Sequence, residues 1–354
     1  MKRILSALLF GLTLSAWHIP HDTSADEIVF LCRLRVDLVG GEDEICTVNP
    51  NGGEQITLTK KPKGLIKNWP TWSPDRTKIL FATSAPSNLY LMNANGGNVT
   101  LLKENYRGAR PAWSPDGQKI AYGGTGPWIA FLDVRTLKEK PMFVPVDRAR
   151  DMAWSPNGRQ LAFVNWNRDH QTGQDIYIIN VDGTDLRQLT DHPGHDRLPA
   201  WAPNGRQIAF YSTRNNDNNS GGIFLMDVDG KKVTELTDGN ETYPSWSPDG
   251  KRFAYIYEDW NRPEFGMHLG TFGEEDVELL PNGSSPAWSP DGSEIAYTLA
   301  HALGSRLTFL DVDTRDQEQP IPDKALQWQH SPSWSAAGDR LAISGTKHPI
   351  PAIL

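Results

Sequence analysis

Residues 111–122 read Pro-Ala-Trp-Ser-Pro-Asp-Gly-Gln-Lys-Ile-Ala-Tyr, and this stretch decides the fold. Its central five residues, Trp113 to Gly117, return with small changes six more times in the 354-residue sequence. The copies are 41 to 47 residues apart and begin at Trp72, Trp113, Trp154, Trp201, Trp246, Trp288 and Trp334. A period of roughly 40 to 50 residues with several short strands per unit is typical of β-propeller blades, because one small sheet cannot bury both of its faces alone.

The residue types in the motif are those of a tight turn. Pro presets φ near −65° for the second turn position, the following Asp accepts local backbone N–H bonds, and Gly supplies the positive φ that ends the turn. Trp buries a large flat surface and still offers one N–H donor. The motif is therefore expected to have a structural role, and its Asp residues are expected to form turns rather than to catalyse a reaction.

Each full unit contains four strand-like runs. The unit that starts at Trp201 shows the pattern: a short run ending in the Trp, then Ile208-Ala209-Phe210, then residues 223–227, then a run ending in Leu236-Thr237. Turn residues such as Asp229-Gly230 separate the last two runs. Four antiparallel strands per unit predict an all-β fold, a β-propeller of four-stranded blades.

The two ends of the chain supply incomplete units. The first unit has three strand-like runs and lacks the Trp motif, whereas the last copy, at Trp334, is followed by one more run at residues 341–343. Joining the two would pair otherwise open sheet edges. This argument predicts seven blades with a composite closing blade. The alternative is a six-bladed ring with loose terminal additions.

The first 25 residues have the pattern of a secretory signal peptide. Lys2 and Arg3 precede an apolar run from Ile4 to Trp17, and residues 23–25 are small. The run is too short for a spanning helix. We expect a signal peptide at 1–25, a single propeller domain at 26–354 with no transmembrane segment, and a periplasmic or extracellular location. The formal charge of −8 argues against a nucleic-acid partner.

Cys32 and Cys46 are the two cysteines, and they lie in neighbouring predicted strands. In an oxidising compartment they could pair and close a 15-residue loop, which would stabilise the fold by about 3 kcal/mol in the chain-entropy model. The alternative is two unrelated buried thiols. We predict the disulfide.

The repeats resemble those of a known family. Runs of the form Trp-Ser-Pro-Asp-Gly-x-x-Ile-Ala-Phe, followed by Ile-Tyr-x-Met-Asn, Asp-Gly and Leu-Thr, are similar to the WD-like propeller repeats of the TolB family. This resemblance covers essentially the whole chain after residue 25. It implies a propeller and an envelope protein that binds a protein partner. TolB also has an N-terminal α/β domain, which we do not expect here because blade sequence follows the signal directly.

Related repeats occur in prolyl oligopeptidases and in oligogalacturonate lyases. A peptidase is not expected, because the sequence contains no Gly-x-Ser-x-Gly elbow. Candidate metal ligands are few. His192 and His195 lie in one loop, but Pro193 and Gly194 between them exclude helical ligand spacing, so we expect no metal or other cofactor.

The variable residues just before each Trp are the better candidates for a binding site. The first strand of a propeller blade lines the axial channel, so residues three and four positions before each Trp lie at or near its mouth. The candidates are Trp69, Arg110, Arg150, Asp151, Arg197, Tyr243 and His330. Arginines mixed with aromatic rings suit carboxylate groups, peptides or sugar acids, because guanidinium binds carboxylates bidentately and stacks on rings. The alternative is a set of solvated loop charges.

The sequence thus predicts an exported, non-enzymatic binding or scaffold protein that engages a protein or peptide partner of the cell envelope at the channel mouth. The alternative function is a metal-assisted lyase or hydrolase that acts on acidic oligosaccharides.

Overall fold

The computed structural model describes most of the repeat region of the chain. The described residues are 28–34, 42–48, 56–59, 67–83, 86–106, 110–124, 126–166, 173–214, 221–237, 239, 241–257, 265–272, 277–301, 304–319, 328–334 and 341–346. The regular elements among them are β-strands, and none of these residues belongs to a helix that is long and apolar enough to cross a membrane. The predicted signal peptide at 1–25 lies outside the described residues.

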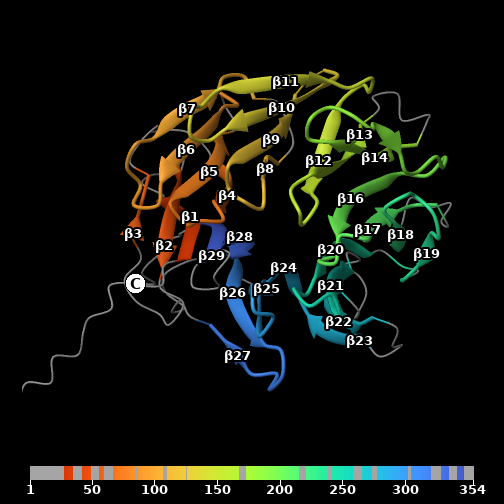
Figure 1. The fold of residues 1–354 in the computed structure, drawn as a ribbon. Helices are drawn as coiled ribbons and strands as arrows, with labels where there is room; N and C mark the ends of the chain where they lie inside the picture. The colour runs from red at the N-terminus through yellow and green to blue at the C-terminus, as the bar shows by residue number, and fades with distance from the viewer. Residues whose placement is uncertain are drawn as a thin grey trace, which may run out of the picture.

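Six sheets have four strands each, and they are arranged as blades around a centre (Figure 1). Within a blade, consecutive strands pair antiparallel, as predicted. The first strand lies toward the centre: β4 (Lys67–Trp72), β8 (Ala112–Trp113), β12 (Ala149–Trp154), β16 (Asp196–Trp201), β20 (Glu241–Trp246) and β24 (Gly283–Trp288). The second strands are β5 (Lys78–Thr83), β9 (Lys119–Gly123), β13 (Gln160–Asn165), β17 (Gln207–Ser212), β21 (Arg252–Tyr257) and β25 (Glu294–His301).

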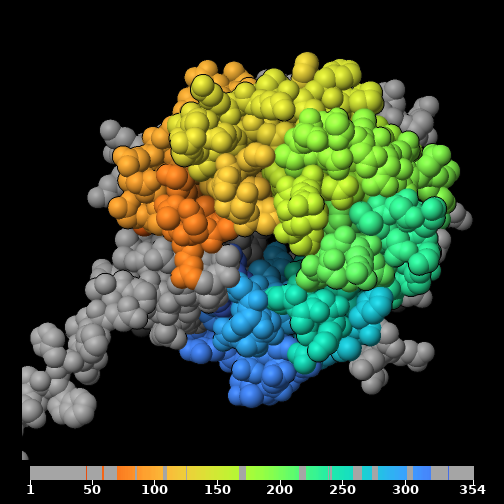
Figure 2. Space-filling model, in the orientation of Figure 1, coloured from red at the N-terminus to blue at the C-terminus, as the bar shows by residue number. Residues whose placement is uncertain are grey.

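The two outer positions of each blade complete the sheet. The third strands are β6 (Leu89–Asn93), β10 (Trp128–Asp133), β14 (Asp175–Asn180), β18 (Gly222–Asp227), β22 (Gly266–Thr271) and β26 (Gly304–Asp311). The fourth strands, toward the rim, are β7 (Thr100–Lys103), β11 (Glu139–Phe143), β15 (Arg187–Gln188), β19 (Thr234–Glu235), β23 (Val277–Pro281) and β27 (Gln317–Glu318). Figure 2 shows that the viewed face is hollowed at the centre, where the first strands converge.

The ends of the chain meet in a further sheet that differs from a blade. Its order is β28 (Trp328–Trp334), β29 (Leu341–Thr346), β1 (Ile28–Leu34), β2 (Glu42–Val48) and β3 (Ile56–Thr57), with β29 and β1 parallel. It lies between the β24–β27 and β4–β7 blades, because β28 contacts β24 and β29 contacts β4. The prediction of seven four-stranded blades is therefore corrected. Six blades are four-stranded, the number in the alternative, because the C-terminal segment adds two strands to a unit that already has three.

The register of β1 and β2 bears on the predicted disulfide. Cys32 is opposite Glu44, and Cys46 is opposite Phe30, so the cysteines are diagonal neighbours on one face of the sheet. Diagonal Cα atoms are about 7–8 Å apart, beyond the usual span of a disulfide. A bond would require local adjustment of the strands. Both cysteine side chains lie outside the described residues, so the disulfide stays a prediction.

The Ser-Pro-Asp-Gly turns are built by local hydrogen bonds. Ser114 Oγ donates to Asp116 Oδ1 at 2.6 Å, and the same oxygen accepts the Gln118 N–H at 3.0 Å. The Ser114 hydroxyl is the largest cause that lowers the pKa of the Asp116 carboxyl, since it stabilises the charged form. The turns at Asp75, Asp249 and Asp291 repeat the Ser–Asp bond. The predicted turn role of these carboxylates is confirmed.

Each turn also packs on the turn of the preceding blade. Gly117 has φ +68°, and a Cβ there would lie 3.3 Å from Cδ of Pro74. The Gly residues at 158, 205, 250 and 292 face the Pro of the preceding turn in the same way. Gly adopts this positive φ at little cost, although Arg76 holds the same position of the first turn with φ 61°.

The motif tryptophans link neighbouring blades. Trp201 Nε1 donates to the Ala153 carbonyl at 3.0 Å, and Ala153 is the residue just before the Trp of the preceding blade. Equivalent bonds run from Trp154 to Ala112, Trp246 to Ala200, Trp288 to Ser245 and Trp334 to Ala287. Trp113 departs from this series: its Nε1 is buried and has no hydrogen-bond partner. We call the boundary between the β4–β7 and β8–β11 blades, where Trp113 lies, the Trp113 seam.

Apolar clusters between blades form the core. One cluster joins Ala162, Val164 and Ile178 of one blade to Trp201, Ile208 and Phe210 of the next. The central Ala of the second strand is buried at Ala121, Ala162, Ala209, Ala254 and Ala296. This small side chain permits close stacking of the sheets, as the sequence indicates.

The indole–carbonyl bonds can be tested with a matched pair of variants. Trp246 and Trp113 are both partly buried, but only Trp246 donates to the preceding blade. We expect Trp246→Phe to lower the free energy of unfolding by about 1 kcal/mol more than Trp113→Phe, because it alone leaves a carbonyl without its donor. Urea denaturation followed by circular dichroism measures the difference. Equal losses would show that the bonds add no stability.

Candidate functional site

A β-bulge interrupts the first strand in five of the six blades and in β28. The register to the second strand shifts between Arg150 and Ala153, between Arg197 and Ala200, and at the equivalent places in β4, β20, β24 and β28. Pro occupies the second position before Trp in most copies, as at Pro199, and it has no N–H for the strand pairing. A bulge removes that conflict and turns the neighbouring residue out of the regular alternation.

The bulge places the residue three positions before Trp in the left-handed region. Asp151, Leu198, Tyr243 and Ser285 have φ values of 48°, 53°, 54° and 53°. Such conformations cost of order 1–3 kcal/mol for non-glycine residues and cluster at functional sites. Two of these four positions, Asp151 and Tyr243, are among the residues predicted to line the channel mouth.

Two predicted arginines share one aromatic ring. The guanidinium carbons of Arg150 and Arg197 lie 4.7 and 4.6 Å from the ring centroid of Trp166. Arg150 and Arg197 come from the first strands β12 and β16, and Trp166 directly follows β13. The backbone N–H of Trp166 donates to the Arg148 carbonyl at 2.7 Å, and this bond fixes the backbone position of the residue that carries the ring. The Nε atoms of Arg150 and Arg197 are buried and have no hydrogen-bond partner.

A carboxylate lies among the arginines. Burial raises the pKa of the Asp151 carboxyl, whereas the charges of Arg150, Arg197 and Arg110 and a hydrogen bond from the Leu198 N–H oppose that rise. Burial also lowers the pKa of Arg197, with Asp151 and Tyr211 acting in the opposite direction. The structure therefore brings Arg110, Arg150, Asp151 and Arg197 together across three adjacent blades. Three guanidinium groups and one carboxyl make this site suited to an anion.

We call Arg150, Asp151, Trp166 and Arg197, with the exposed Arg110 beside them, the arginine site. Sequence reasoning missed Trp166, because it considered only positions before each motif Trp. The signal that could have found it is an aromatic residue at the first position after a second strand. Tyr243 is on β20 and is exposed. Trp69 and His330 are in β4 and β28, but their side chains lie outside the described residues.

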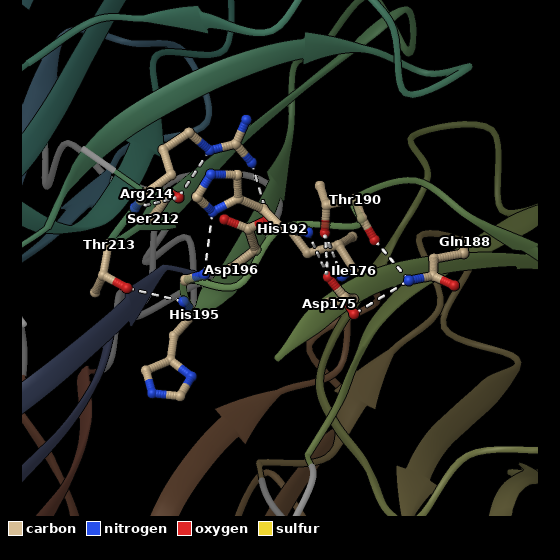
Figure 3. Close-up of polar contacts among 11 residues, drawn as sticks. Asp175, Ile176, Gln188, Thr190, His192, His195, Asp196, Ser212, Thr213 and Arg214 are labelled. Carbon is tan, nitrogen blue, oxygen red and sulfur yellow. Dashed lines mark hydrogen bonds and ion pairs between the residues drawn. The ribbon is translucent and has the colours of Figure 1, made fainter. Parts of the chain in front are cut away.

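The loop with the two histidines has a different geometry. Figure 3 shows the imidazoles of His192 and His195 pointing apart. His192 Nδ1 accepts the Gly194 N–H at 3.0 Å, and the His195 N–H donates to Thr213 Oγ1 at 2.8 Å. Across the described residues, no group of three His, Cys, Asp or Glu side chains is placed to hold a metal ion. The structure does not bring these two histidines together as ligands.

A buried ion pair and a half-buried carboxyl flank this loop (Figure 3). Asp196 is fully buried, and its Oδ2 pairs with Arg214 at 2.9 Å; Arg214 also lies over the rings of Phe210 and Phe224. Burial raises the pKa of the Asp175 carboxyl to about 6, and the charges of Asp196 and Asp191 contribute. These contacts hold the loop between β15 and β16 in place.

The pH dependence of stability tests the Asp175 environment. The pKa of the Asp175 carboxyl is raised from 3.8 to about 6 in the folded state, so the native protein holds the carboxyl proton more tightly than the unfolded chain does. The protonated Asp175 therefore stabilises the fold at low pH, and this stabilisation is lost as pH rises from about 4 to about 6. We expect Asp175→Asn to remove this part of the dependence in thermal unfolding scans.

Asp191→Asn serves as the comparison, because it removes one charge that raises the Asp175 pKa. The decline in stability should then begin at the same pH, which the unfolded-state pKa sets, and end at a lower pH than in the wild type. Identical pH profiles for the wild type and Asp175→Asn would contradict the assignment.

Comparison with known proteins identifies the family. Residues 87–338 match the family model described as the TolB beta propeller domain, which is more than half of the chain. No curated protein is similar enough to count as a match.

Solved structures share the fold at low identity. Oligogalacturonate lyase from Vibrio parahaemolyticus is 15% identical with a TM-score of 0.67, over 90% of this chain and 94% of that one. An oligogalacturonate lyase in complex with manganese is 16% identical with a TM-score of 0.62, over 85% and 86%. TolB from Acinetobacter baumannii is 18% identical with a TM-score of 0.52, over 82% and 79%. On the strength of its repeats, its blades and the family match, the chain belongs to the TolB beta-propeller family.

Proposed function

We propose that this protein is an exported, non-enzymatic binding or scaffold protein that holds a carboxylate-bearing protein or peptide partner of the cell envelope at the arginine site. The observation that carries the proposal is that Arg150 and Arg197 lie over one ring, Trp166, with their buried Nε–H groups unpaired. Because the Nε–H groups themselves are out of reach of solvent, a carboxylate would bind the terminal N–H groups of the two guanidiniums.

The chemistry of the site selects a carboxylate. Guanidinium groups that stack on a ring keep their N–H edges available and match the two oxygens of a carboxylate. Asp151 lies among them with a raised pKa. It disfavours highly charged anions and can present a hydroxyl when protonated. A side-chain or terminal carboxylate of a peptide fits these conditions.

The proposed location has separate support. The first 25 residues have the features of a signal peptide, and membership of the TolB beta-propeller family agrees with a periplasmic setting. TolB from Acinetobacter baumannii has the same fold.

The test uses acidic peptides and a charge-matched control. Arg150→Ala with Arg197→Ala should weaken binding of a Glu-rich peptide on the order of 100-fold, since each charge-assisted hydrogen bond contributes about 1.5–3 kcal/mol. Fluorescence anisotropy measures the affinity, and the matching Gln-rich peptide should not bind. The same double variant should no longer retain its partner from envelope extract.

Arg159→Ala with Arg206→Ala is the control. These two exposed arginines belong to the same two blades and lie at the other ends of their second strands, beside the turns. This variant should bind like the wild type. Equal weakening in both double variants would mean that net charge, not the arginine site, attracts the peptide.

A second candidate function is a lyase for acidic oligosaccharides, because two oligogalacturonate lyases share the fold over 85% or more of this chain. The same arginines would then bind sugar carboxylates. Incubation with oligogalacturonate and Mn²⁺ distinguishes the two functions: absorbance from an unsaturated product would support the lyase.

A further inference from the structure

The Trp113 seam contains a cavity whose lining includes none of the arginine-site residues. Its volume is about 460 Å³, and it lies between the end of β7 and the β8–β11 blade. Its lining includes Tyr106, Tyr122, Trp128, Lys103 and Glu139. The two blades are neighbours, with β4–β7 at the upper left of Figure 1 and β8–β11 at its top. At this boundary the Trp113 indole makes no bond to the preceding blade, so the seam lacks a contact found at five others.

The cavity exists because small residues line its floor. Ala130 of β10 is opposite Tyr122 of β9 and Pro141 of β11, so these three lie in a row across one face of the blade. The alanine leaves a hollow between the larger neighbours. Gly124 and Gly126 continue this surface without side chains, and a Cβ at Gly124 would meet nothing within 4 Å.

Aromatic rings form the walls. Tyr106 and Tyr122 are buried and meet edge to face, with centroids 5.8 Å apart. Trp128, at the opening, is 47% exposed, and Phe143 contacts it at an interplanar angle of 79°. A large aromatic side chain left half exposed beside a concave surface is a common feature of ligand sites.

The cavity is lined by hydrogen-bond donors and an acceptor, and together these polar groups carry no net charge. Tyr122 Oη is buried beside the Glu139 carboxylate and interacts with it, although the two groups do not meet the geometry of a full hydrogen bond. Lys103 Nζ bonds both carboxylate oxygens of Glu139, at 3.0 and 2.9 Å. Burial, with the nearby Glu139 carboxylate, raises the pKa of Tyr122, so its hydroxyl keeps its proton and remains a donor.

We propose that this cavity binds a neutral sugar unit of a glycan, with the sugar ring against Trp128 and its hydroxyls on Tyr122, Lys103 and Glu139. A pyranose has an apolar C–H face and a rim of hydroxyls that each donate and accept. It therefore matches an open aromatic surface beside a phenol hydroxyl and a neutral ion pair. An anionic ligand would meet Glu139 and a cationic ligand Lys103. A hydrocarbon would offer no hydrogen bonds to the hydroxyl, ammonium and carboxylate groups that line the cavity. This proposal does not depend on the proposed function of the arginine site.

The test titrates the full-length protein with cellobiose and chitobiose by isothermal calorimetry, with tetramethylammonium and acetate as charged probes. We expect saturable binding of at least one disaccharide and none of the charged probes. Trp128→Ala should weaken binding more than tenfold. Tyr122→Phe, which keeps the ring, should weaken it about 2- to 10-fold, as the loss of one hydrogen bond predicts.

Phe272→Ala is the matched control, because Phe272 is an aromatic residue of similar exposure on a distant blade. It should leave sugar affinity unchanged. The proposal would be overturned if neither disaccharide bound, or if tetramethylammonium bound instead. Sugar binding that is unchanged in Trp128→Ala would also overturn it.

Discussion

The bond from a Trp indole to the carbonyl of the preceding blade is the contact on which the ring depends. It joins equivalent residues of neighbouring repeats, Trp201 to Ala153 and Trp154 to Ala112, so five seams have the same link between one blade and the last. The turn that follows adds a second link, since each Gly faces the Pro of the preceding turn. Both links come from five adjacent residues. This explains why a short motif is retained while the loops at the other end of each blade vary in length and composition.

Local chemistry made most of the fold predictable. Turn residues and alternating apolar runs predict four strands per unit, and the Ser114–Asp116 bond shows that the carboxylate is used by its own turn. The five-stranded closing sheet was misjudged because motif counting cannot show how many strands two partial units contribute. The bulges also escaped prediction. Their signal was the Pro before most motif Trp residues, as at Pro244, which cannot donate to the strand pairing.

The arginine site was predictable in part, because some of its residues follow the repeat. Arg150, Asp151 and Arg197 occupy equivalent repeat positions, so a periodic reading finds them. Trp166 has no such periodicity: it belongs to a variable loop and reaches the arginines only because the blades are arranged in a ring. The cavity at the Trp113 seam was not predictable either. It results from the placement of small residues such as Ala130 opposite bulky ones, and cross-strand register cannot be read from one sequence.

The parallel pairing of β1 with β29 has a consequence for how the chain folds. Val29 pairs with Ala342, so the contact that joins the ends spans almost the whole polypeptide. Each four-stranded blade is a local meander that can form soon after its residues are available. The pairing of β1 with β29 must wait until the last strand has been made. Bringing distant segments together also carries the largest entropic cost and slows folding. During synthesis β1–β3 would have an unpaired edge for longest, which makes that edge the point where a chaperone or a second chain has the most time to act.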